Sequence, residues 1–300
     1  MDEIFRKAGT RGWVHARCLD CDAEFGSGAD EPVVLSSVVK VPLVLEFARQ
    51  VAAGQLDPTD RVRATAADRL GGVATAGCAD DVEFSLRDAA LLALTVSDNT
   101  AADLLFDRVG VDNVRSLVRE LGLTHTRIAG SQRDILESMA DDIGARDALD
   151  FVQRFPALSP AEVLATRALD PLRTTASTPR DMTLLLSLIG RDRAAPEQAC
   201  RWVRDLMREQ FSGHRLPSGF AADVRTWSKT GTLPGVRNEI GVVEYPDGSR
   251  YAIAVFTACD NLAQRQPEVD HVIGVVARQS VERIVHGLPY TTFQGRCGMS

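Results

Sequence analysis

Strand-like runs occupy both ends of the chain, and long apolar stretches with helical spacing fill its middle. Near the N-terminus, GWVHARCL (12–19) and DAEFG (22–26) predict two short strands around a polar turn. Near the C-terminus, three more strands are predicted, the last two joined as a hairpin by PDGS (246–249): VRTWSKT (224–230), VRNEIGVVEY (236–245) and RYAIAVFTA (250–258).

The middle of the chain predicts helices. SSVVKVPLVLEFARQVAAGQL (36–56) is apolar nearly all round, which indicates a central helix rather than a surface one. Ser85 with Asp88 forms a capping box, and Thr178 with Pro179 and Asp181 predicts another helix start. Further helices are predicted over 84–96, 100–110, 112–123 (closed by Gly122), 177–190, 196–211 and 266–286.

Strands at both ends are expected to pair into one antiparallel sheet. This arrangement predicts an α/β (α+β) protein with two parts. Residues 1–33 and 213–300 form an α/β subdomain with the terminal helix on the sheet, and residues 34–212 form an all-helical subdomain. A groove between them is the expected active site. The tail TTFQGRCGMS (291–300) is expected to be frayed.

Composition excludes several function classes. The 300 residues carry 34 basic and 41 acidic side chains, so the net charge is −7, without the excess of basic residues that is typical of nucleic-acid-binding proteins. No apolar stretch reaches 18 residues, which excludes a membrane span, and the N-terminus has no apolar signal-peptide region. We therefore expect a cytoplasmic protein. Its six cysteines, including the pair in CLDC (18–21), are expected to be free thiols without a zinc or redox role.

The apolar run VVLSSVVKVPL (33–43) carries a lysine where burial is expected. Ser37 and Lys40 are at i and i+3, so a helix places both side chains on one face. A lysine in apolar surroundings loses affinity for its proton and can activate a serine hydroxyl. Alone, the pattern equally describes a capping serine and a lysine that extends to solvent.

Two further motifs make this pattern specific. Ser97-Asp98-Asn99 lies between two predicted helices, and Lys229-Thr230-Gly231-Thr232 ends a predicted strand. The order S-x-x-K, S-D-N, K-T-G is the signature of class A β-lactamases and penicillin-binding proteins. Most of the chain resembles the class A β-lactamase-like superfamily, particularly its serine hydrolases that end in a KTGTLPGVRNE-type strand. The resemblance implies the class A β-lactamase-like fold.

The resemblance also implies catalytic roles. Ser37 is the nucleophile that takes up the acyl group, and Lys40 orients and deprotonates it. Ser97 relays a proton to the leaving group. Ser36, at i−4 from Lys40, lies outside the motif and is expected to cap the helix. The backbone N–H groups of Ser37 and Thr232 form the oxyanion hole.

The remaining motif residues are expected to bind substrate. Asn99 bonds Lys40 or the substrate amide, whereas Asp98 holds the loop in shape. Lys229 offers a positive charge to a substrate carboxylate. Hydroxyls come from Thr230 and Thr232, and Gly231 allows the substrate backbone to approach.

Two regions depart from the family pattern. The E-x-x-L-N loop, whose glutamate activates the water for deacylation, is missing, and residues 114–237 contain no asparagine. Counting forward from LGLTHTRI puts the glutamate position at Gln132, which we favour; counting back from TTASTPRDM puts it at Glu162. After KTGT, Arg237 and Asn238 alternate across the sheet, so only one of them faces the groove, and Arg237 is the candidate for substrate binding.

These features predict an active-serine hydrolase that forms an acyl-enzyme from an amide, ester, lactam or short peptide, without metal or organic cofactor. One alternative is a cytoplasmic acyltransferase of natural-product biosynthesis, with an amine acceptor. The other is a sensor that binds β-lactams or peptides without turnover. The sequence leaves open the acyl donor, the acceptor, hydrolysis versus transfer, and the oligomeric state.

Overall fold

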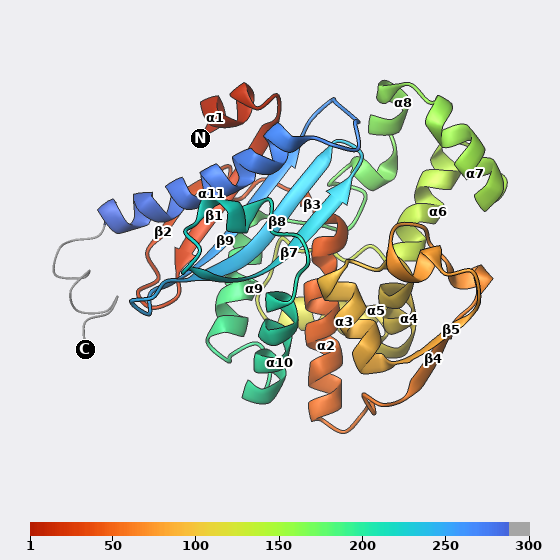
Figure 1. Cartoon of the computed structure of the whole chain (residues 1–300), viewed down its shortest axis with the longest axis horizontal. Helices are drawn as coiled ribbons and strands as arrows, with labels where there is room; N and C mark the ends of the chain where they lie inside the picture. Colours follow the sequence, from red (N-terminus) through yellow and green to blue (C-terminus); the bar gives the residue numbers. More distant parts are fainter. Residues whose placement is uncertain (288–300) are drawn as a thin grey trace.

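A five-stranded antiparallel sheet draws its strands from both ends of the chain (Figure 1). The computed structural model describes residues 1–287, so the predicted frayed tail and Cys297 lie outside the described residues. The strand order is β2-β1-β9-β8-β7, which leaves β7 at one edge. Its strands are β1 (Arg11–Cys18), β2 (Glu24–Ser27), β7 (Arg225–Leu233), β8 (Val236–Glu244) and β9 (Arg250–Ala258).

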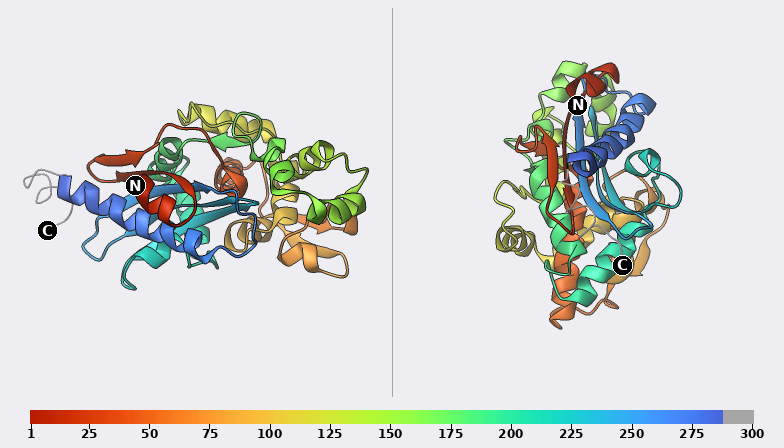
Figure 2. Two further views of the ribbon diagram at one scale, coloured as in Figure 1. Left: turned by 90° about the horizontal axis from the view of Figure 1, so that it is seen from above. Right: turned by 90° about the vertical axis from the view of Figure 1, so that its left-hand side faces the viewer.

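Both faces of the sheet are buried. Successive side chains of a strand point to opposite faces, so each strand contributes to two cores. In β9, Tyr251, Ile253 and Val255 join a core with α11 (Pro267–Gly287), whereas Ala254 and Phe256 join the larger core of the helical region. Figure 2 shows α11, with α1 (Asp2–Lys7) beside it, on one side of the sheet and the helices from the middle of the chain on the other. The α+β architecture predicted from the sequence is confirmed.

Helices in the middle of the chain begin where the capping residues predict. The Ser85 hydroxyl accepts a hydrogen bond from the Asp88 N–H at the start of α3, and Thr178 accepts one from the Asp181 N–H at the start of α9. α9 packs against β9 and β1, opposite α11. The helices of this region are α2 (Lys40–Ala52), α3 (Leu86–Thr95), α4 (Asn99–Val109), α5 (Val111–Glu120), α9 (Pro179–Gly190) and α10 (Glu197–Arg208).

Residues 132–169 form a group of short helices that the sequence analysis did not anticipate. Its elements have their own small core, in which Ile135, Met139 and Ala168 are buried. The group reaches the sheet at the β7–β8 turn, since a Cβ on Gly235 would lie 3.3 Å from Leu164 Cδ2. It comprises α6 (Gln132–Asp142), α7 (Ala148–Arg154), η4 (Phe155–Ala157), α8 (Pro160–Leu164) and η5 (Arg167–Leu169).

Other short elements were also absent from the sequence-based prediction. Two strand pairs lie apart from the main sheet, β3 (Val33–Val34) with β6 (Ala176–Ser177), and β4 (Arg61–Ala64) with β5 (Val82–Ser85). Single turns of 3₁₀ helix include η1 (Ser36–Val39) and η6 (Leu216–Gly219), and the chain opens with α1 (Asp2–Lys7). None of the helices within residues 1–287 is long and apolar enough to cross a membrane. The predicted subdomain boundaries stay a prediction.

Candidate active site

Ser37 lies in η1, the single 3₁₀ turn that leads into α2. Its neighbours Ser36, Val38 and Lys40 are buried, whereas Ser37 is half-buried. None of residues 1–287 forms a hydrogen bond with the Ser37 hydroxyl. In the first turn of a helix the backbone N–H groups lack intrahelical acceptors, so they are available to a substrate oxygen.

The Lys40 ammonium points at the SDN loop. Its Nζ donates to the Ser97 carbonyl oxygen at 2.7 Å and to Asn99 Oδ1 at 2.8 Å, and it lies 3.4 Å from Ser97 Oγ. Burial lowers the pKa of Lys40 well below its ordinary value of 10.5; the nearby Lys229 charge acts in the same direction and Asp98 opposes both. Burial favours the neutral amine, which is the form of lysine that can accept a proton.

The SDN loop holds its serine in an unusual backbone conformation. Ser97 has φ +61°, in the left-handed region that a non-glycine residue enters at a cost. Asp98 fixes the loop: it is fully buried, accepts from the Ala101 N–H as the N-cap of α4, and accepts from the Thr75 N–H at 2.9 Å. Asp98 therefore contacts backbone rather than the lysines, as the sequence analysis expects.

Lys229 approaches the same hydroxyl from the sheet. Its buried Nζ donates to Ser97 Oγ at 3.0 Å and to the Thr230 carbonyl oxygen at 2.9 Å. Burial lowers the pKa of Lys229 to about 7, with Glu239 raising it and Arg215 lowering it further. The Ser97 hydroxyl thus lies between two buried lysines and can pass a proton from one side to the other.

The β7 edge packs directly on the residues before Ser37. A Cβ on Gly231 would lie 2.8 Å from the Leu35 carbonyl oxygen, so only glycine fits without displacing backbone. The Thr232 N–H donates to Ser36 Oγ at 3.0 Å, and that hydroxyl donates to the Thr232 carbonyl at 2.9 Å. Ser36 therefore does not cap a helix, and that prediction is wrong, because its φ of +52° directs the side chain to the strand.

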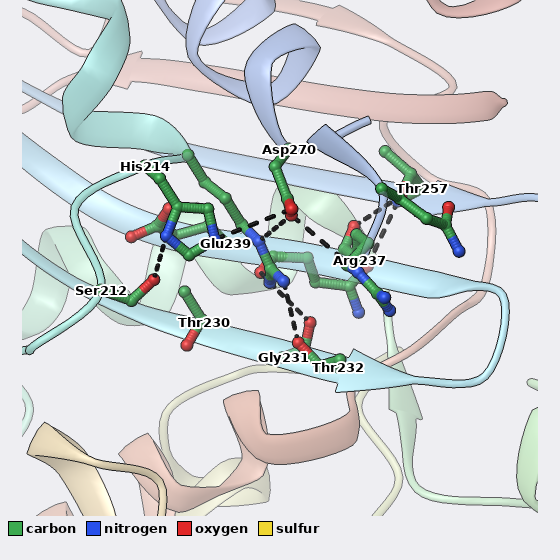
Figure 3. A network of polar contacts seen from close by, with 12 residues as sticks. Ser212, His214, Thr230, Gly231, Thr232, Arg237, Glu239, Thr257 and Asp270 are labelled. Carbon is green, nitrogen blue, oxygen red and sulfur yellow. Dashed lines mark hydrogen bonds and ion pairs between the residues drawn. The ribbon is translucent and has the colours of Figure 1, made fainter. Parts of the chain in front are cut away.

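Arg215 is a cation at this edge that the sequence analysis missed. Its guanidinium donates to the Gly231 and Asn238 carbonyl oxygens and to Thr232 Oγ1, each at 3.0 Å. Figure 3 labels Gly231, Thr232 and Asp270 in this network of polar contacts. Asp270 on α11 accepts from Arg215 Nε at 2.6 Å. Arg215 lies in the segment before η6, outside the predicted strands, and no local motif distinguishes it from other arginines.

Arg237 is not placed to bind substrate, contrary to the sequence-based expectation. It is 4% exposed, and its guanidinium donates to the carbonyl oxygens of Val236 and Gln264, among others. Arg237 faces the α11 side of the sheet, because Asn238 occupies the opposite face and donates from Nδ2 to the Val34 carbonyl oxygen. Strand alternation allowed one of the two residues to face the site, and Arg237 is the wrong one.

Glu239 is a second polar residue that the sequence analysis missed. The carboxyl is fully buried and accepts hydrogen bonds from the Leu216 N–H, Ser228 Oγ and Gln210 Nε2. Burial raises its pKa, and these donors oppose the shift. Gln210 in turn accepts from the Thr230 N–H at 2.7 Å. A carboxylate inside the apolar run VRNEIGVVEY was the available signal.

The two loop candidates lie in different environments. Gln132 is the first residue of α6 and is 8% exposed, and its Nε2 has no hydrogen-bond partner within residues 1–287. The next residue anchors α6 beside the SDN motif, since the Arg133 N–H donates to Asp103, one turn along α4 from Asn99. A buried amide without a partner is suited to bind a substrate or a water.

Glu162 has a structural role at the start of α8, and its place at the deacylation position stays a prediction. Its exposed carboxylate accepts from the Ser159 N–H and hydroxyl, forming the capping box of α8. Those bonds lower the pKa of Glu162. Glu137 is exposed as well.

Other sequence features add no site. Cys18 and Cys21 are present as thiols, and burial raises the pKa of the Cys18 thiol above its usual range. The part of the chain that the structure describes has no group of three or more His, Cys, Asp or Glu side chains that could hold a metal ion.

Comparison with known proteins gives a consistent result. Residues 1–284 match the beta-lactamase enzyme family. The beta-lactamase regulatory protein BlaB of Streptomyces cacaoi is 30% identical over 301 residues, covering 94% of this chain and 95% of that protein. The crystal structure of a beta-lactamase from Sphaerobacter thermophilus superposes with a TM-score of 0.74 at 25% identity, covering 96% of this chain and 97% of the other. The L158E mutant of PBP-A, an acyl-enzyme complex with penicillin G, has a fold that superposes with a TM-score of 0.73 at 21% identity and 94% coverage of both chains.

Proposed function

Because the chain belongs to the beta-lactamase enzyme family, we propose that it is an active-serine enzyme that takes an acyl group onto Ser37 from an amide, ester or lactam. One observation carries the proposal: Ser97 Oγ lies 3.0 Å from Lys229 Nζ and 3.4 Å from Lys40 Nζ, and both lysines are buried. Buried lysines with lowered pKa values around one hydroxyl are characteristic of sites that carry out acid–base chemistry, which acyl transfer requires.

Acylation then proceeds in two balanced steps. Neutral Lys40 accepts the Ser37 proton as Oγ attacks the carbonyl carbon, and the carbonyl oxygen gains the negative charge. When the carbon–leaving-group bond breaks, the proton passes through Ser97 Oγ to the leaving atom, and the carbonyl re-forms as an ester of Ser37. The N–H groups of Ser37 and Thr232 stabilise the oxyanion, a contribution typically worth about 10²–10³ in rate.

Substrate binding follows from the surrounding groups. A substrate carboxylate would find Lys229, Thr230 and Thr232 on β7, with Arg215 bonded to the Thr232 hydroxyl. Asn99, whose Oδ1 accepts a hydrogen bond from Lys40, has its amide nitrogen left for the carbonyl of an acylamino group. These groups favour an acyl donor with a carboxylate next to the reacting bond.

The acylation proposal is tested by intact mass spectrometry after exposure to a panel of β-lactams and activated esters. The expected result is a mass increase of one acyl group, mapped to Ser37 by peptide sequencing and absent in Ser37→Ala. Labelling that persists in Ser37→Ala would remove Ser37 from the nucleophile role.

Deacylation is expected to be slow in water. Gln132 is the favoured residue at the position of the missing glutamate, and a neutral amide orients water without accepting its proton. Losing a general base forfeits about 10²–10⁴ in rate, so a penicillin adduct should be long-lived.

A second candidate function is a sensor that becomes acylated and does not turn over. The observation that favours it is the similarity to BlaB, whose name describes a beta-lactamase regulatory protein. Both functions share the Ser37 adduct and differ in its fate. Release of product over many cycles would support the enzyme, and one stable equivalent of adduct would support the sensor.

The amine acceptor stays a prediction from the sequence. Decay of the adduct should be followed with and without added amines. Amide product and faster decay would support acyl transfer, whereas decay that is independent of amine would leave hydrolysis.

A further inference from the structure

The hydroxyl of Ser36 hydrogen-bonds with both polar backbone groups of Thr232, the N–H and the C=O. It accepts from the Thr232 N–H at 3.0 Å and donates to the Thr232 carbonyl oxygen at 2.9 Å. β7 is the edge strand of the sheet, so these backbone groups have no partner strand. An extended amide can bind such an edge through the same N–H and C=O pair. Ser36 therefore occupies the position that a substrate amide would take.

The backbone holds Ser36 in this position. Its φ of +52° is in the left-handed region, where a serine is strained, and its side chain is 5% exposed. The segment cannot move away from β7 easily, because Leu35 is buried and its carbonyl oxygen lies against Gly231. Strained residues of this kind persist where the surrounding structure fixes them, and they gather at functional sites.

We propose that Ser36 closes the oxyanion hole of the resting protein and that an acyl donor must displace its hydroxyl before Ser37 reacts. The proposal rests on the proposed function, in which the Thr232 N–H binds the carbonyl oxygen of the donor. Ser36 is then a positioning residue, not a nucleophile: it competes with substrate for the Thr232 N–H and C=O.

The competition affects every donor alike, because each must displace the same two hydrogen bonds of Ser36. A donor with an N–H beside its reacting carbonyl can then bond both the N–H and the C=O of Thr232. A simple ester offers an acceptor for the Thr232 N–H and no donor for the Thr232 carbonyl. This difference between donors does not depend on Ser36, so removal of the hydroxyl should accelerate both kinds of donor by similar factors.

The kinetic test compares wild type with Ser36→Ala, which removes the hydroxyl and keeps a side chain at the strained φ. Acylation by a p-nitrophenyl ester should become about tenfold faster in Ser36→Ala, the equivalent of one net hydrogen bond. Acylation by a fluorescent penicillin should rise by a similar factor, because the same two bonds no longer have to be displaced. The thiol of Ser36→Cys is a weaker hydrogen-bonding group, so the acylation rates of this variant should lie between those of wild type and Ser36→Ala.

Three kinetic results would overturn the proposal. Equal rates in wild type and Ser36→Ala would show that the hydroxyl is no barrier. A slower Ser36→Ala with reduced thermal stability would assign Ser36 a purely structural role between η1 and β7. An adduct mapped to Ser36 would make it the nucleophile.

Amide hydrogen exchange tests the contact without acylation. In a Ser37→Ala background, the Thr232 N–H should exchange at least tenfold faster after Ser36→Ala, because it loses its acceptor. The Thr230 N–H, which donates to Gln210 Oε1, is the matched control and should not change. Unchanged exchange at Thr232 would refute the contact itself. If the Thr232 N–H exchanges faster after Ser36→Ala but no donor acylates the wild-type protein, the Ser36–Thr232 contact is supported and the proposed function fails.

Discussion

At the scale of single residues, two fully enclosed lysines distinguish the candidate site. Lys40 and Lys229 are both 0% exposed, and each hydrogen-bonds with groups of the SDN loop. Enclosure removes water from the ammonium groups, which is the largest cause of their lowered pKa values. The same desolvation that makes them useful as bases lowers the stability of the fold.

Lys40→Arg should lose acylation by about 10²–10⁴, because arginine remains protonated and cannot act as the general base. In wild type the acylation rate should rise with pH through a group that titrates well below 10.5, because burial lowers the pKa of Lys40. Stopped-flow acylation over a pH series checks both statements. An active Arg variant would remove Lys40 from the base role.

Lys229→Met should flatten the dependence of stability on pH. The pKa of Lys229 is about 7 in the fold and 10.5 ordinarily, so between these values the unfolded chain binds more protons than the native one. The free energy of unfolding therefore rises with pH in this window, by about 2 kcal/mol from pH 7 to 9, and is lost as pH falls. Urea titrations at both pH values compare wild type with the variant. Parallel curves would contradict the buried, depressed lysine.

At the scale of elements, Gln132 and Glu162 each lie in the first turn of a short helix, α6 and α8, but their environments differ. α6 is capped by Ser131 with Asp134, and α8 by Ser159 with Glu162. Both pairs are capping boxes, so Glu162 has a structural role at its helix start. Gln132 follows its cap, is buried, and has an Nε2 without a partner among the described residues. Gln132 is the candidate because its side chain is buried and its Nε2 is unpaired among the described residues, and not because it begins a helix.

Gln132→Glu should speed hydrolysis of the acyl-enzyme by tenfold or more. The new carboxylate would lie in the first turn of α6, where the helix dipole stabilises it, and could accept a proton from water. Glu162→Gln is the matched control: it should leave deacylation unchanged and lower stability slightly through a weaker cap. Deacylation is measured by recovery of free protein after removal of excess donor. Loss of deacylation in Glu162→Gln alone would show that the other alignment is correct.

At the scale of the whole molecule, the candidate site depends on residues far apart in the sequence. Arg215 Nε donates to Asp270 on α11 at 2.6 Å, while its other nitrogens bond the backbone and hydroxyl of the KTGT segment. The side chains are 6% and 15% exposed. The terminal helix, on the opposite side of the sheet from the larger core, thereby fixes the strand edge at which substrate is proposed to bind.

Asp270→Asn should destabilise the protein by about 3–5 kcal/mol, because Arg215 would keep its buried charge and lose its carboxylate. Asp205→Asn removes one of two carboxylate partners of Arg208, the other being Glu244, in a more exposed pair and should cost no more than about 1 kcal/mol. Urea unfolding of both variants provides the comparison. Equal, small losses would show that the Arg215–Asp270 pair contributes no more than a surface ion pair.

The sequence by itself determined the fold class and the members of the catalytic motifs. Period-two and helical patterns and capping residues act locally, so β7, β8, β9, α3 and α9 could be placed from them. Ser37, Lys40, Ser97 and Lys229 could be selected because fixed spacings on a helix, loop and strand bring characteristic chemistry together. The choice of Gln132 over Glu162 came from counting along the chain, and their burial now favours Gln132.

Only the tertiary structure decided which polar groups meet. Arg215 and Glu239 reach the KTGT strand across a turn and a neighbouring strand, and no local pattern records such contacts. Strand alternation alone does not say whether Arg237 or Asn238 faces the candidate site. The packing of α11 on one face of the sheet decides it, with Arg237 on that face and Asn238 on the other. Ser36 was expected to cap a helix, but its positive φ turns the hydroxyl to Thr232. The physical reason is common to all four: their partners are chosen by the approach of segments distant in sequence, and burial forces each polar atom to find a partner there.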